Sequence, residues 1–66
     1  MTIPTIQRRL LRIAAEAKRG DFERAHSLEI ELFVEVLRAV AEGKAGAVEA
    51  GECLRSLELR FIRATA

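Results

Sequence analysis

The segment from Phe22 to Glu42, folded as one helix, is apolar around most of its circumference. A helix turns by about 100° per residue, which gathers the polar side chains of this segment into roughly a quarter of the circle. That polar stripe holds Arg24, Ser27, Glu31, Glu35, Arg38 and Glu42. A surface helix normally shows the reverse proportion of polar and apolar faces. We therefore expect this helix to be covered on nearly every side, by its own chain or by another.

Two glycine-containing breaks divide the chain into three expected helices. Gly20 followed by Asp21 is typical of a helix end and the N-cap of the next helix, and residues 43–46 form the second break. The expected helices span about residues 4–19, 22–42 and 46–63. Short connections favour antiparallel neighbours. The sequence thus predicts one all-α domain over residues 1–66, a three-helix antiparallel unit with a long central second helix.

The second helix is expected to take part in self-association. At about 1.5 Å per residue it is roughly 30 Å long, against a little over 20 Å for the first helix, so part of it should extend beyond its neighbours. Half of the residues are hydrophobic, and a domain of this size is only marginally stable alone. We expect a homodimer or higher oligomer. Its apolar interface is predicted to use Leu28, Leu32, Phe33, Val36 and Val40.

The charges give a weaker indication of a nucleic-acid partner. The net charge is only +1, so the overall charge does not favour nucleic acid. Residues 1–20 nevertheless contain five Lys or Arg and one Glu. The candidate phosphate-contacting residues are Arg8, Arg9, Arg12 and Arg19. The three phenylalanines all fall on apolar stripes, which disfavours stacking on single strands, and a nucleic-acid-binding accessory protein is therefore the alternative function.

Three polar residues within apolar stripes need partners. Glu23, His26 and Glu29 read Glu-x-x-His-x-x-Glu, and Glu-x-x-His is half of the ligand set of di-iron carboxylate bundles. With one histidine in the chain, only an oligomer completes such a metal site, with Glu58 as a facing carboxylate. Otherwise His26 and Glu29 bond to each other, Glu29 pairs with an arginine such as Arg9, or these residues fix the register of a subunit interface.

Other chemistry is not indicated. Cys53 is the only cysteine, so no internal disulfide forms, and a structural thiol is the expected role. The sequence contains no nucleophile–base constellation and no glycine-rich phosphate loop. No apolar run is long enough for a signal-peptide core or a membrane span. We expect a cytoplasmic protein that is not an enzyme, with no cofactor.

One stretch carries a resemblance. In ERAHSLEIELFVEVLRAVAEG, Ala25 and His26 are followed by a spaced Glu29, a Val-Leu pair and a helix end at Gly43. Over residues 21–43 this resembles small bacterial or prophage-encoded helical proteins of unknown function. The resemblance implies a helical fold and no particular activity. The function expected from the chain as a whole is a small non-enzymatic interaction or regulatory protein, working through an apolar helix groove or the basic face of the first helix.

Overall fold

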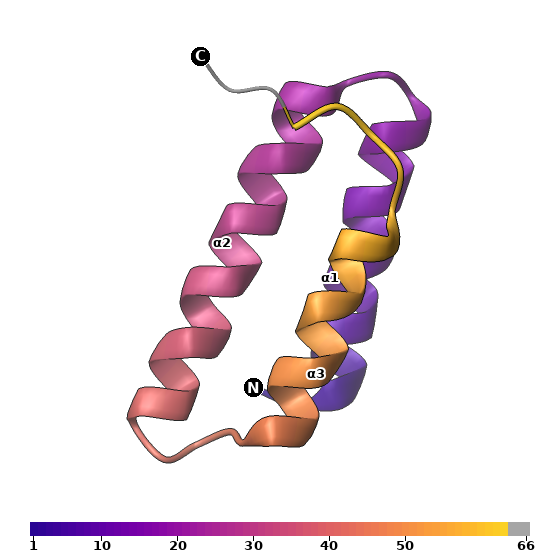
Figure 1. The fold of residues 1–66 in the computed structure, drawn as a ribbon. Helices are drawn as coiled ribbons and strands as arrows, with labels where there is room; N and C mark the ends of the chain where they lie inside the picture. The colour runs from indigo at the N-terminus through magenta and orange to yellow at the C-terminus, as the bar shows by residue number, and fades with distance from the viewer. Residues whose placement is uncertain (64–66) are drawn as a thin grey trace.

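The computed structural model describes residues 1–63 and shows three α-helices packed side by side (Figure 1). The helices are α1 (Ile3–Lys18), α2 (Phe22–Ala41) and α3 (Ala47–Leu54), and α3 is followed by the short 3-10 helix η1 (Arg55–Glu58). Along the chain they run up, down and up, so that α2 is antiparallel to both α1 and α3 (Figure 1). Residues 1–63 contain no strand. The all-α, three-helix prediction is confirmed.

Local signals fix the helix boundaries at the predicted breaks. The side chain of Asp21 accepts a hydrogen bond from the backbone N–H of Arg24 at 3.1 Å, which caps the start of α2. Gly20 (φ +84°) and Gly43 (φ +73°) adopt the left-handed conformation just after α1 and α2. Only glycine adopts this conformation at little cost, so these two positions end the helices.

The core fills the space between the three helices. Ile6 and Ile13 of α1 and Cys53 of α3 are buried there. The buried residues of α2 include Leu28, Leu32 and Val36. All three were expected in a subunit interface, and the structure places them in the core of one chain instead. The reason is that α1 and α3 both pack against this side of α2, whereas Phe33 is only partly buried and Val40 is exposed.

The third helix is shorter than predicted. The prediction of a helix over residues 46–63 is wrong beyond Leu54, because η1 follows and the backbone is extended at Leu59. The guanidinium of Arg63 donates to the backbone oxygens of Ser56 (2.9 Å) and Leu59 (3.1 Å), and these bonds hold the chain in a turn instead of a further helical turn. No Gly or Pro marks this break in the sequence.

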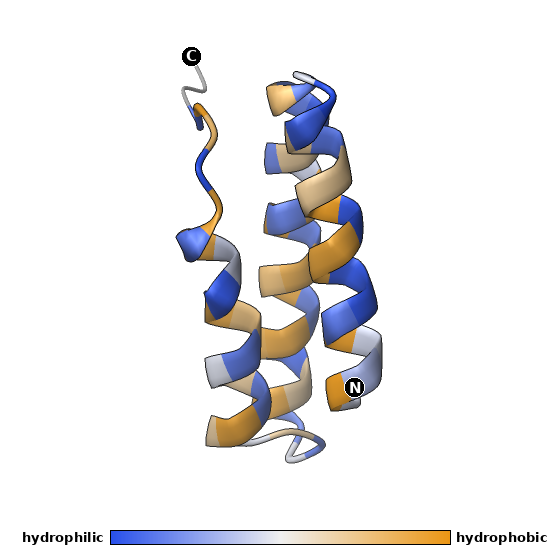
Figure 2. Cartoon of the chain, turned by 90° about the vertical axis from the view of Figure 1, so that its right-hand side faces the viewer, coloured by the Kyte–Doolittle hydropathy of each residue, from blue (hydrophilic) through white to orange (hydrophobic). Residues whose placement is uncertain are grey.

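After η1 the chain runs as an extended segment toward the start of α2 (Figures 1 and 2). There Phe61 stacks on Phe22, with the ring centroids 6.4 Å apart. The extended segment thus covers a part of α2 that α3 is too short to reach. In the part of the chain described by the structure, no helix is long and apolar enough to cross a membrane.

Candidate interaction surface

One side of α2 has no cover among residues 1–63. Ile30, Val34, Leu37 and Ala41, which we call the α2 strip, are all exposed. The exposed fractions are 47% for Ile30, 42% for Val34 and 67% for Leu37. At about 100° per residue these four positions share one line along the helix, roughly opposite the buried Leu32. The strip is therefore an apolar face on the solvent side of the helix.

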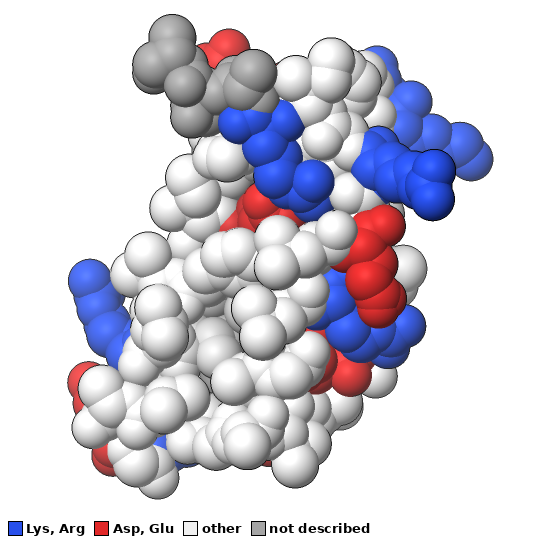
Figure 3. Space-filling model, viewed as in Figure 1, with Lys and Arg blue, Asp and Glu red and all other residues white. Residues whose placement is uncertain are grey.

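The apolar surface continues from the α2 strip toward α3. Phe33 and Val40 flank the strip on the side of α2 that bears Glu29, whose partner Ser56 belongs to η1. Exposed aliphatic side chains of α3 and η1 include Leu54 and Leu57. Figure 3 shows a broad area without charged side chains over the lower parts of α2 and α3. Single exposed aliphatic residues are ordinary, but a contiguous apolar area marks an interaction site.

The other flank of the α2 strip is charged. Glu31 and Arg38 are exposed there, next to the side of α2 that faces α1, where Arg9 pairs with Glu35. Neither Glu31 nor Arg38 takes part in an ion pair among residues 1–63. Arg38 thus keeps its charge available to a partner, and Glu31, although it lines a hollow with Arg8 and Arg12, is not bonded to either of them.

A second feature of α2 is the buried carboxylate of Glu29, which is 2% exposed. Arg63 donates to it from Nε at 2.8 Å and from Nη2 at 3.0 Å, and the Ser56 hydroxyl donates a further hydrogen bond. Burial by itself would raise the pKa of Glu29, but the hydrogen bonds from Arg63 and Ser56 and the charge of Arg63 together lower it below its ordinary value. We call Glu29, Ser56 and Arg63 the buried cluster.

The prediction that an arginine pairs with Glu29 is confirmed, but the arginine is not the one named as the example. The carboxylate of Glu29 bonds neither to His26 nor to Arg9, and its main partner is Arg63, 34 residues further along the chain. The only signal in the sequence was that a buried carboxylate requires a partner, which does not say which one. The arginine also lies over the ring of Phe61, 3.9 Å from the centroid, which fixes its orientation.

The other predicted buried polar residues differ from Glu29. His26 is partly buried, and its Nδ1 has no hydrogen-bond partner among the described atoms. Glu58 was predicted to lie inside an apolar stripe, but it is exposed at the end of η1. A 3-10 helix turns about 120° per residue instead of 100°, so the change of helix type at Arg55 moves Glu58 off the expected face.

The four candidate metal ligands do not form a cluster within one chain. Within the described range, no group of three or more His, Cys, Asp or Glu residues is placed to hold a metal ion. The carboxylate of Glu29 is already engaged by Arg63 and Ser56. Glu58 lines a groove against α1, and Glu23 is exposed near the start of α2. The geometry thus gives no support to a metal site built on Glu23, His26, Glu29 and Glu58.

The basic face of α1 is interrupted by carboxylates. Arg8 and Arg12 are exposed but line a hollow together with Glu31 and Glu35 of α2. Arg9 pairs with Glu35, and Arg19 pairs with Glu16 at 3.1 Å. A phosphate backbone approaching this surface would meet negative charges beside the arginines. The candidate phosphate-contacting residues are therefore partly neutralised by their own chain.

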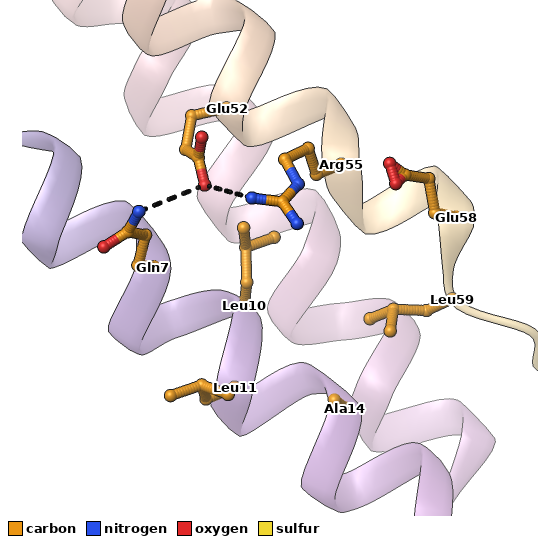
Figure 4. Close-up of a pocket in the computed structure, with 8 residues that line it drawn as sticks. All are labelled: Gln7, Leu10, Leu11, Ala14, Glu52, Arg55, Glu58 and Leu59. Atoms are coloured by element: carbon orange, nitrogen blue, oxygen red, sulfur yellow. Dashed lines mark hydrogen bonds and ion pairs between the residues drawn. The ribbon is translucent and has the colours of Figure 1, made fainter.

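A shallow groove separates α1 from α3 and η1 (Figure 4). Its apolar lining consists of Leu10, Leu11, Ala14 and Leu59. At its edge, the carboxylate of Glu52 accepts hydrogen bonds from Arg55 (3.1 Å) and, more weakly, from Gln7 (3.5 Å). Three polar side chains of this groove, Gln7, Glu52 and Arg55, are bonded to one another, and the lining includes no nucleophile with an adjacent base. The groove therefore provides a shallow apolar surface without the groups of a catalytic site.

The single thiol is not placed for chemistry. Cys53 is buried in the core, and this burial raises its pKa, so the thiolate form required of a nucleophile is disfavoured. Among the residues that the structure describes, the main feature left uncovered is the apolar face of α2 and α3. No protein-family model matches this chain, and no curated protein or solved structure is significantly similar to it.

Proposed function

We propose that this chain is a small non-enzymatic interaction protein that works as a helical homo-oligomer, with the α2 strip and its neighbours on α3 as the contact surface. The observation that carries the proposal is the row of exposed aliphatic side chains on α2. Full burial of one Leu, Ile or Val side chain contributes about 1.5–3 kcal/mol. Burial of Ile30, Val34 and Leu37 in an assembly therefore contributes a favourable free energy that is absent in the separate chain.

The size of the chain supports the same conclusion. A domain of 66 residues buries only about 60% of the surface of its unfolded chain. The core described above uses one side of α2, while the remaining apolar surface is left in water. A second helix packed on this surface would add to the buried apolar area without any change in the fold of the chain.

Sedimentation equilibrium at micromolar protein concentration tests the proposal. We expect an average mass well above the 7.4 kDa of one chain, and a mass that rises with protein concentration. A single species of one chain mass across the micromolar range would contradict the proposal.

A further inference from the structure

The α2 strip has the spacing of a coiled-coil seam. Its residues follow one another at intervals of four, three and four positions, from Ile30 through Val34 and Leu37 to Ala41. This alternation is the a/d pattern by which two helices interlock side chains along a common line. The seam covers about one and a half heptads, or roughly 17 Å of helix. It is long enough to set a register for one helix packed on another.

We propose that α2 pairs with α2 of a second copy in antiparallel orientation, in one particular register. In this register Val34 packs against Leu37 of the partner subunit, and Ile30 packs against Ala41 of the partner subunit. The inference rests on the proposed self-association through the α2 strip and adds the direction and the register of the pairing. A two-fold axis near the middle of the seam relates the two chains, so each contact occurs twice.

Charge complementarity selects the antiparallel orientation. With Val34 beside Leu37 of the partner subunit, Glu31 lies beside Arg38 of the partner subunit, and the symmetry repeats this pair. Both side chains are exposed and neither takes part in an ion pair within residues 1–63. A parallel pairing instead places Arg38 beside Phe33, and Glu31 beside His26, of the partner subunit. Only the antiparallel arrangement brings the two opposite charges together.

The opposite flank of the seam is apolar in the same register. Phe33 then faces Val40 of the partner subunit, and this contact also occurs twice. This flank lies toward α3, where the surface without charged side chains continues (Figure 3). In the proposed dimer this uncharged area over the lower parts of α2 and α3 adjoins the seam.

Charge reversal tests the register. Glu31→Arg and Arg38→Glu each replace two attractive pairs by two repulsive ones, and each should raise the dissociation constant by about tenfold or more. The double variant Glu31→Arg/Arg38→Glu restores both pairs and should bind within about twofold of the unaltered chain. Both positions are exposed, so circular dichroism should show unchanged helix content. The register is overturned if the single reversals leave the dissociation constant unchanged, or if the double variant is as weak as the singles.

Cysteine cross-linking tests the direction independently. The double variant Ile30→Cys/Ala41→Cys should form a disulfide-linked dimer on mild oxidation, whereas Ala41→Cys alone should not, because two Ala41 positions lie roughly 17 Å apart along an antiparallel seam. The unaltered chain is the blank, since Cys53 is buried. Efficient cross-linking of Ala41→Cys alone would overturn the antiparallel orientation. Self-association that is insensitive to all these variants rejects this register but keeps the proposed function, whereas a monomer at every concentration rejects both.

Discussion

Two consecutive residues of α2 lie in opposite environments. Glu29 is charged and buried, and Ile30 beside it is aliphatic and exposed. The charge of Glu29 is compensated within the chain by Arg63 and Ser56. The apolar surface of the α2 strip, which includes Ile30, is not covered by any other part of residues 1–63. We infer that the buried cluster holds the single chain together and that the strip holds two chains together.

Removal of Arg63 should give the largest loss of stability. Arg63→Ala leaves the carboxylate of Glu29 buried without its cation, and breaking a buried pair in this way costs about 3–5 kcal/mol. Arg60→Ala is the matched control, because Arg60 is exposed and only three residues away. Its free energy of unfolding should change by no more than about 0.5 kcal/mol. Urea unfolding measures the free energy of unfolding of both variants. Equal losses in the two variants would show that the buried cluster does not stabilise the fold.

A charge on the α2 strip should act on assembly and spare the fold. Leu37→Lys removes a side chain worth about 2 kcal/mol of apolar burial in each copy and introduces a charge into the seam, so the dimer should weaken by at least about thirtyfold. Leu11→Lys is the control, since Leu11 is 72% exposed and lies away from α2 on the groove of Figure 4. Sedimentation velocity separates the two. If Leu11→Lys dissociates the assembly and Leu37→Lys does not, the contact surface is the groove.

The buried cluster should also make stability depend on pH in the acid range. The pKa of Glu29 is lowered in the folded chain, so the unfolded chain binds more protons between the folded and unfolded pKa values, and stability rises with pH there. This contribution is fully present above the ordinary pKa of 4.5 and is lost as the pH falls through the lowered value.

The check is urea unfolding between about pH 3 and pH 6, compared with Glu29→Gln. The glutamine variant is less stable, but its unfolding free energy should depend less on pH in this range. An identical pH dependence in both proteins would mean that Glu29 is not the group whose protonation weakens the fold.

The smallest expected effect is on the rate of thiol alkylation, measured for one thiol on each side of α2. Cys53 packs in the core against the buried side of α2, and its burial raises the pKa of the thiol, so alkylation of the folded chain should be slow. A second thiol placed by Val34→Cys should react fast in dilute protein and more slowly as the assembly forms. Mass spectrometry of timed samples follows both sites. Equal protection of the two thiols at high dilution would show that the α2 strip is covered by its own chain.

Local signals predicted much of the fold but little of the buried cluster. Gly20, Asp21 and Gly43 act within a few residues of their positions, so the first two helices could be read from the sequence almost to the residue. The end of α3 depends on Arg63 reaching back to Ser56 and across to Glu29. Such a contact joins distant positions, and a helical pattern that continues past Leu54 conceals it.

The sequence predicted how much of α2 is apolar, but not which of its apolar residues face the core and which face solvent. The broad apolar face of α2 indicated more apolar surface than the neighbouring helices cover, and Ile30, Val34 and Leu37 are indeed exposed in the described structure. The residues chosen for a subunit contact nevertheless included Leu28, Leu32 and Val36, which are core residues. When a helix is apolar on nearly all sides, its periodicity does not show which side faces the core. Only the positions of α1 and α3 show that Ile30, Val34 and Leu37 face outward.

The most direct test of this division is the urea unfolding midpoint measured across about a hundredfold range of protein concentration. A folded dimer that dissociates on unfolding gains stability by mass action, so the midpoint of the unaltered chain should rise with concentration. In Leu37→Lys the midpoint should be independent of concentration, and in Arg63→Ala it should be lower at every concentration. A midpoint of the unaltered chain that does not change with concentration would contradict the assignment of the α2 strip to assembly.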